Sequence, residues 1–233
     1  KCTFCAEPLR EGVLVRKDFS WIAQLAELHP RASIYFQDSI FPGGEAVQTK
    51  LLPLLKDLGR PWGCQVYLPT LSRRFLRRLA DSGCRYLYTG LESSSSYILA
   101  GVGKPALDAA VALERLRWTK ESAVDVGISL QFGTLSVSGK LLETESSIDA
   151  TVQFAQRIVQ ESVPVSGFYP NITTVLPGTT LARGLLNAGI ELDFYRMPRS
   201  ERLDGFEDGA VGHNFMTIPE VTGPQTEAIA ELV

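Results

Sequence analysis

Histidine is nearly absent from this chain of 233 residues, which contains only His29 and His213. Neither follows a predicted strand, so the sequence argues against a hydrolytic zinc site and against His-based acid–base catalysis. Cysteine is scarce as well, with four residues in the whole chain. So few thiols in a chain of this length, without secretory features, do not indicate a disulfide framework.

An excess of basic charge and long apolar runs are also missing. Lys and Arg number 23 against 26 Asp and Glu, for a net charge of −3, so the chain lacks the basic surface that attracts nucleic acid. No apolar run approaches the roughly 20 residues that a membrane-spanning helix needs, and the first residues contain no apolar leader segment. We therefore expect a cytoplasmic protein that binds neither nucleic acid nor membrane.

Short strand-like runs alternate with longer helical patterns along most of the chain. Strands are predicted at residues 33–37, 64–68, 84–90, 124–132 and 167–176. Apolar residues at helical spacing predict helices at residues 19–29, 45–58, 73–80, 105–121, 145–161 and 179–188. This alternation indicates right-handed βαβ crossovers and a parallel sheet.

The helix predicted at residues 19–29 has no strand before it in this sequence. We expect that strand upstream of residue 1, which brings the count to six βα units and predicts an α/β fold of the partial (β/α)6 TIM-barrel type over residues 1–190. Residues 191–233 differ because they are rich in charged residues and glycine. We expect an irregular C-terminal extension there, with a terminal helix at residues 224–233.

Reactive groups of parallel α/β folds collect in the loops after the carboxyl ends of the strands. In this chain the first such loop carries Cys2 and Cys5, two thiols three positions apart. Their spacing alone fits half of a zinc site, a redox dithiol or part of an iron–sulfur site. Cys64 and Cys84 each follow a glycine and open an apolar run, so we expect them to be small buried thiols.

Five short motifs lie on the predicted loops in chain order. They are Cys2-Thr-Phe-Cys5, Asp38-Ser-Ile-Phe41, Gly43-Gly44-Glu45, Gly90-Leu-Glu92-Ser93 with Lys104, and Pro177-Gly178-Thr179. Together they resemble the radical S-adenosylmethionine (SAM) superfamily, and in particular its cobalamin-dependent, methyltransferase-like branch. The first is similar to the last two thirds of that family's Cys-x-x-x-Cys-x-x-Cys loop. The resemblance implies that Cys2 and Cys5 bind a 4Fe-4S cluster, with the third cysteine upstream of residue 1.

The resemblance also implies which side chains hold SAM, while no catalytic residue can be named. These side chains are Phe4, beside the adenine, and Asp38, Glu45, Glu92, Ser93, Ser129 and Gln131. Structural alternatives stay open for several of them. Phe4 could instead pack the cysteine loop, Asp38 or the pair Glu92-Ser93 could cap the following helix, and Glu45 could be an acid of a first helical turn.

A cobalamin-dependent SAM methyltransferase is the activity that the resemblance implies. Its substrate would be an unactivated carbon of a natural product, an amino acid or a peptide, with tryptophan-type methylation as one example. A cobalamin-binding domain is expected upstream, and a flavodoxin or ferredoxin is the expected electron donor. Two alternatives stay open: a radical SAM enzyme of another outcome, such as a methylthiotransferase or a cyclising enzyme, and a non-catalytic α/β scaffold with a structural metal at its cysteines.

Overall fold

The computed structural model describes residues 2–6, 19–41, 43–105 and 107–192. Five strands form one sheet: β1 (Ile34–Phe36), β2 (Trp62–Gln65), β3 (Cys84–Glu92), β4 (Asp125–Phe132) and β5 (Val165–Ile172). They lie side by side in chain order, and every neighbouring pair is parallel. The predicted parallel α/β fold is confirmed, and a sixth strand, together with residues 193–233 and the helix predicted at 224–233, lies outside the described residues.

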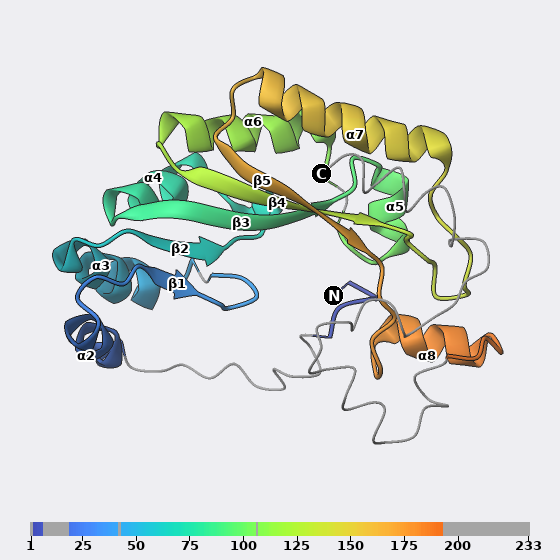
Figure 1. Cartoon of the computed structure of the whole chain (residues 1–233), viewed down its shortest axis with the longest axis horizontal. Coiled ribbons are helices and arrows are strands. Elements are labelled where there is room, and N and C mark those ends of the chain that lie inside the picture. The colour runs from blue at the N-terminus through green and yellow to red at the C-terminus, as the bar shows by residue number, and fades with distance from the viewer. Residues whose placement is uncertain (1, 7–18, 42, 106, 193–233) are drawn as a thin grey trace.

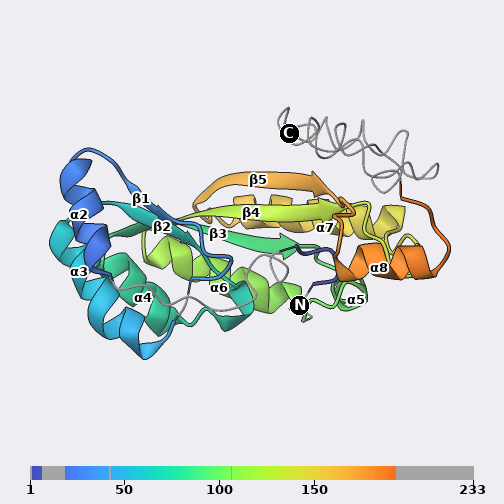
Figure 2. The same ribbon diagram turned by 90° about the horizontal axis from the view of Figure 1, so that it is seen from below.

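Helices precede, connect and follow the strands. They are α2 (Ser20–Leu28), the π-helical turn η1 (Val47–Leu51), α3 (Leu52–Leu58), the 3-10 turn η2 (Leu68–Thr70), α4 (Arg73–Asp81), α5 (Ser96–Gly101), α6 (Ala109–Glu121), α7 (Glu145–Gln160) and α8 (Thr180–Asn187). Figure 1 shows α4, α6 and α7 along the outer side of the curved sheet, whereas α5 and α8 lie beyond the carboxyl ends of the strands; Figure 2 gives the same arrangement from below. None of the described helices is long and apolar enough to cross a membrane.

Side-chain caps account for several helix boundaries. The hydroxyl of Ser72 accepts a hydrogen bond from the amide of Phe75, so α4 begins at Arg73, the expected first residue. Asp108 accepts from two amides of the first turn of α6, which therefore begins four residues after the expected start. The Ser-rich segment before residue 96 caps α5 through Ser95, a short helix that the periodicity did not predict.

The two faces of the sheet carry different kinds of side chain. On β4, the side chains of Val126, Ile128, Leu130 and Phe132 belong to the main hydrophobic core, which also includes residues of α3, α4, α6 and α7. The residues between them on β4 therefore face the other way, because successive side chains of a strand alternate. We call this second side the inner face; it carries the polar groups of the candidate site.

Four tyrosines cover the inner face near the amino ends of the strands. The rings of Tyr35 and Tyr86 lie 6.0 Å apart, and those of Tyr88 and Tyr169 lie 5.6 Å apart, measured between centroids. A methyl group at Gly127 would come within 2.4 Å of the Tyr86 hydroxyl and 3.1 Å of the Tyr88 ring. Glycine at this strand position thus gives the rings room to lie across the sheet.

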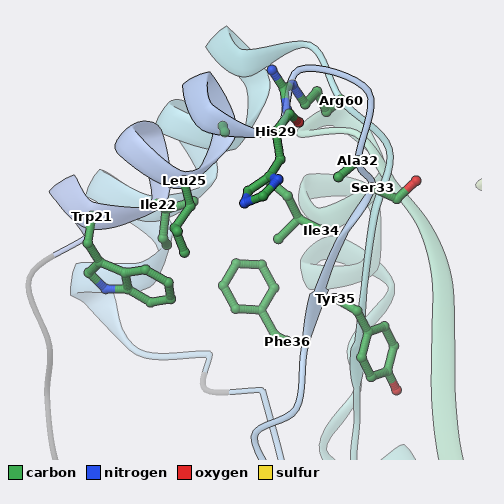
Figure 3. Close-up of a pocket in the computed structure, with 11 residues that line it drawn as sticks. Trp21, Ile22, Leu25, His29, Ala32, Ser33, Ile34, Tyr35, Phe36 and Arg60 are labelled. Atoms are coloured by element: carbon green, nitrogen blue, oxygen red, sulfur yellow. The ribbon is translucent and has the colours of Figure 1, made fainter.

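A cavity of about 330 Å³ lies between α2 and β1. Figure 3 shows the side chains of Trp21, Leu25 and Phe36 around it, with His29 and Arg60 toward one end. Its lining is mostly apolar, and a guanidinium hydrogen bond of 2.6 Å joins Arg60 to the carbonyl of His29. Because α2 lies at the opposite end of the sheet from α5 and α8 (Figure 1), this cavity is separate from the cysteine loop.

Candidate functional site

The two cysteines of the first motif lie on a tight turn that is anchored at both sides. The amide of Cys5 donates to the carbonyl of Cys2 at 3.2 Å, which closes the turn. The amide of Thr3 donates to Val102 at the end of α5, and its carbonyl accepts from Leu181 in the first turn of α8, both at 2.8 Å. These backbone bonds hold the cysteine turn against α5 and α8, which lie beyond the carboxyl ends of the strands (Figure 1).

Phe4, between the two cysteines, packs into the protein. Its ring contacts two small clusters of buried side chains at once, one with Leu181 of α8 and the other with Ile98 and Val102 of α5. The ring ties the cysteine turn to both helices, which adds an apolar anchor to the two backbone bonds.

The thiol of Cys2 lies close to an ion pair. Its pKa is raised first by burial, and Cys5 and Glu92 raise it further, whereas the positive charge of Lys104 lowers it. The bond from the amide of Thr3 to Val102, two residues before Lys104, sets the cysteine turn beside this pair. A neighbouring ammonium favours the thiolate, which is the form that binds a metal.

The direction of the Glu92 side chain follows from an unusual backbone conformation. It has a φ of 67°, and the register between β3 and β4 shifts between Gly90 and Glu92. Such irregularities re-aim a side chain at the end of a strand. The Glu92 carboxylate then pairs with Lys104 at 2.9 Å and accepts from Ser129 at 3.4 Å, and both charged side chains are largely buried, at 15% and 9% exposed.

A row of polar side chains continues from Glu92 across the inner face. The amide nitrogen of Asn171 donates to the hydroxyl of Ser129 at 3.0 Å, and that of Gln131 donates to the hydroxyl of Thr173 at 3.0 Å. Ser129 and Gln131 lie on β4, whereas Asn171 lies on β5. Three of the predicted SAM contacts, Glu92, Ser129 and Gln131, are thus placed on neighbouring strands.

The other predicted contacts lie elsewhere. The hydroxyl of Ser93 is buried, at 3.2 Å from that of Thr151 on α7, and it accepts from the amide of Ser95. Asp38 and Glu45 are exposed, on the segment between β1 and η1. Within the described residues, no hydrogen bond or ion pair joins either carboxylate to the cysteine turn.

Sequence reasoning left two residues of this site without a role. Lys104 stands in one of the quoted motifs, but its pairing with Glu92 depends on the turn after α5, which closes through the bond from the Lys104 amide to Leu99. Asn171 could have been found from alternation along its strand, because it lies two positions after Tyr169 and so shares the inner face.

Comparisons with solved structures identify this fold. TsrM of Kitasatospora setae, a radical SAM methyltransferase solved with cobalamin and a 4Fe-4S cluster bound, matches 78% of this chain and 36% of its own, with a TM-score of 0.62 and 17% identity. The cobalamin-dependent SAM radical enzyme OxsB matches 93% of this chain and 37% of its own, with a TM-score of 0.57 and 12% identity. Methylornithine synthase (PylB) matches 81% and 59%, with a TM-score of 0.56 and 11% identity. This chain has the radical SAM fold.

Sequence comparison also finds a relative. A protein of Pyrococcus horikoshii, named as an uncharacterized methyltransferase, is 25% identical over 192 residues. The match covers 77% of this chain and 38% of the relative, so the chain spans about two fifths of that protein's length. No protein-family profile matches the chain.

The residues at the cysteine turn fit part of the cluster site expected in a radical SAM fold. Cys2 and Cys5 are free thiols, both half-buried, and soft sulfur ligands suit iron–sulfur clusters. Among the described residues, no group of three or more His, Cys, Asp or Glu is close enough to hold a metal ion. The hydroxyls of Thr3 and Tyr67 are buried without a hydrogen-bond partner in the described structure, as donors facing an absent acceptor would be.

Proposed function

We propose that this chain is the core of a cobalamin-dependent SAM methyltransferase. Its substrate would be an unactivated carbon of a natural product, an amino acid or a peptide, with a tryptophan-type side chain as one example. The proposal rests on the Cys2–Cys5 turn, which is anchored at the carboxyl end of a parallel sheet beside the buried Glu92–Lys104 pair. The fold of TsrM and OxsB and the name of the Pyrococcus relative support it.

The residues of the site would divide the work between the cofactors. A bound 4Fe-4S cluster supplies an electron to SAM, and cobalamin carries a methyl group. Cys2 and Cys5 would hold the cluster, with Lys104 favouring the thiolate of Cys2. Glu92 would accept from the amino group of SAM through Oε2, which the described structure holds only by the long bond from Ser129. Ser129 and Gln131 offer hydroxyl and amide groups for the ribose.

A further domain and a partner protein would complete the reaction. We propose a cobalamin-binding domain outside this chain and a flavodoxin or ferredoxin that delivers the electron. The reactants would lie on the inner face of the sheet, between the cofactors. This face has its polar row near the cysteine turn and its tyrosines nearer the amino ends of the strands.

Cluster assembly is the direct test. The full-length protein is reconstituted anaerobically with iron and sulfide, and the Cys2→Ala variant is compared with a matched variant, Cys64→Ala. Cys64 is a buried thiol of β2 in the main core and has no place at the site. We expect Cys2→Ala to lose most of its iron, sulfide and brown colour and all methyl transfer from SAM, whereas Cys64→Ala keeps its full iron and sulfide content.

Each other result decides against a specific part of the proposal. A Cys2→Ala variant that keeps its full iron and sulfide content rules out the cluster site. A colourless wild-type protein with bound zinc supports the structural-metal scaffold instead. A wild-type protein that holds the cluster and cleaves SAM, yet transfers no methyl group from methylcobalamin to any candidate substrate, indicates a radical SAM enzyme of another outcome.

A further inference from the structure

Tyr67 lies where β2 gives way to the turn η2, and its backbone is fixed on both sides. The carbonyl of Tyr67 accepts from both the amide and the hydroxyl of Thr70, at 2.9 and 3.0 Å. The neighbouring Leu68 is fully buried in the main core, and its carbonyl accepts from Arg115 of α6 at 2.7 Å. The phenol of Tyr67 therefore projects from a rigid part of the sheet's carboxyl end.

The hydroxyl of Tyr67 has no hydrogen-bond partner in the described structure, although it is buried. Burying a hydroxyl without a partner is costly, and buried polar atoms in folded proteins nearly always have one. Such an atom at the edge of a candidate site indicates an acceptor that arrives with a ligand. The hydroxyl of Thr3, inside the cysteine turn, is buried and unpartnered in the same way.

The charge of Cys2 affects the pKa of this phenol. Burial raises the pKa of Tyr67, and the charge of Cys2 raises it further. The Tyr67 hydroxyl thus keeps its proton at the carboxyl end of the sheet, the end where the cysteine turn also lies, and it is able to donate that proton in a hydrogen bond.

We propose that the Tyr67 hydroxyl donates a hydrogen bond to a sulfur of the iron–sulfur cluster held at Cys2 and Cys5, and so sets how readily the cluster accepts an electron. The inference rests on the proposed function, because it needs a cluster at these thiols. A hydrogen bond to sulfur stabilises the reduced cluster more than the oxidised one, since the reduced form carries more negative charge. Tyr67 is then a positioning residue that acts through the cluster.

The test compares Tyr67→Phe with Tyr97→Phe in the reconstituted full-length protein. Tyr97 is a tyrosine of α5 with 61% of its surface exposed, so it controls for the loss of a hydroxyl away from the cluster. Iron content, the thermal midpoint of the cluster-free protein and the reduction potential of the cluster are measured for each. We expect Tyr67→Phe to keep its iron and its thermal midpoint, because its hydroxyl has no partner among the described residues to lose.

The reduction potential of the cluster tests whether Tyr67 donates this hydrogen bond. At the wild-type midpoint, the ratio of reduced to oxidised cluster should fall about tenfold in Tyr67→Phe, the effect of one lost charge-assisted hydrogen bond, and should stay unchanged in Tyr97→Phe. An unchanged ratio in a Tyr67→Phe protein that holds its cluster overturns the inference and leaves the proposed function standing. A wild-type protein without a cluster overturns both. If Tyr67→Phe does not fold, Tyr67→Met, which fills the same space without a donor, is measured in its place.

Discussion

Glu92 occupies a backbone conformation that L-residues seldom adopt, with a φ of 67°. A non-glycine residue in this region costs on the order of 1–3 kcal/mol, so its surroundings must hold it there. The ammonium of Lys104 does this from two sides, because it bonds both the Glu92 carboxylate at 2.9 Å and the carbonyl of Gly90 at 2.5 Å. A methyl group on Gly90 would lie 2.2 Å from the Glu92 carboxylate, so a larger residue there would displace the pair.

The Lys104→Met substitution tests this arrangement. It leaves the buried Glu92 carboxylate without its partner, so we expect the free energy of unfolding to fall by about 3 kcal/mol. Adding Glu92→Gln in the same chain removes the unpaired charge and should restore much of the loss. Urea unfolding of the single and double variants measures both effects. Lys120→Met, at an exposed lysine of α6, is the matched control and should change stability by less than about 0.5 kcal/mol.

At the scale of single elements, the loop between β4 and α7 is held together by a buried acid. The Glu143 carboxylate accepts from the amide of Thr134 at 3.0 Å and from its hydroxyl at 2.9 Å. An isolated antiparallel bridge pairs Leu135 with Leu141 between them. Burial raises the pKa of Glu143 above its ordinary value, while the bonds from Thr134 oppose that rise.

This shift predicts a pH dependence of stability. Because the folded protein holds the Glu143 proton more tightly than the unfolded chain does, the free energy of unfolding should fall as pH rises from the unfolded pKa, about 4.3, through the raised folded value. Glu143→Gln has no such proton, so its decline over this range should be shallower than that of the wild type. Urea unfolding at a series of pH values measures it, with Glu114→Gln, an exposed acid of α6, as control. Equal slopes for wild type and Glu143→Gln would show that Glu143 does not titrate with folding.

Much of this element order was predictable because the local sequence determines it. Apolar runs such as that of β4 and side-chain caps such as Ser72 act within a few residues of themselves. The π-helical turn η1 was not predictable: Pro53, at the start of α3, has no amide to donate, and the backbone before it adopts a wider turn that leaves the apolar spacing intact. The direction of Glu92 also escaped prediction, since it depends on the register between two strands.

Over the whole molecule, the candidate site lies where a large core meets two small ones. The main core joins the sheet to α3, α4, α6 and α7, whereas α8 packs in a cluster of its own with Leu135 and Val175. The cysteine turn bridges α8 and α5 through the bonds of Thr3 and the ring of Phe4. The site is thus supported by the smaller and less cooperative parts of the fold.

Hydrogen–deuterium exchange followed by mass spectrometry should reveal this division. In the cluster-free protein we expect the amides of α8 to exchange faster than those of β3 and β4, because few buried contacts hold the helix. Loading the cluster should slow exchange in α8, since the amide of Leu181 bonds the turn that carries the ligands. Exchange in α2, at the far end of the sheet, provides the internal reference and should not change. Unchanged protection of α8 on loading would separate the helix from the site.

The tyrosines of the inner face give the protein a built-in optical reporter. Their rings are fixed over strand glycines in a chiral array, and neighbouring rings are tilted by 47° and 56°. Coupled aromatic rings in fixed orientations produce circular dichroism in the near ultraviolet, a signal that fades when specific packing is lost. Burial and the bond to Tyr169 also raise the pKa of Tyr86 to about 12, so this phenol keeps its proton well into alkaline solution. A molecule that settles on this face would disturb the spectrum directly, without any label.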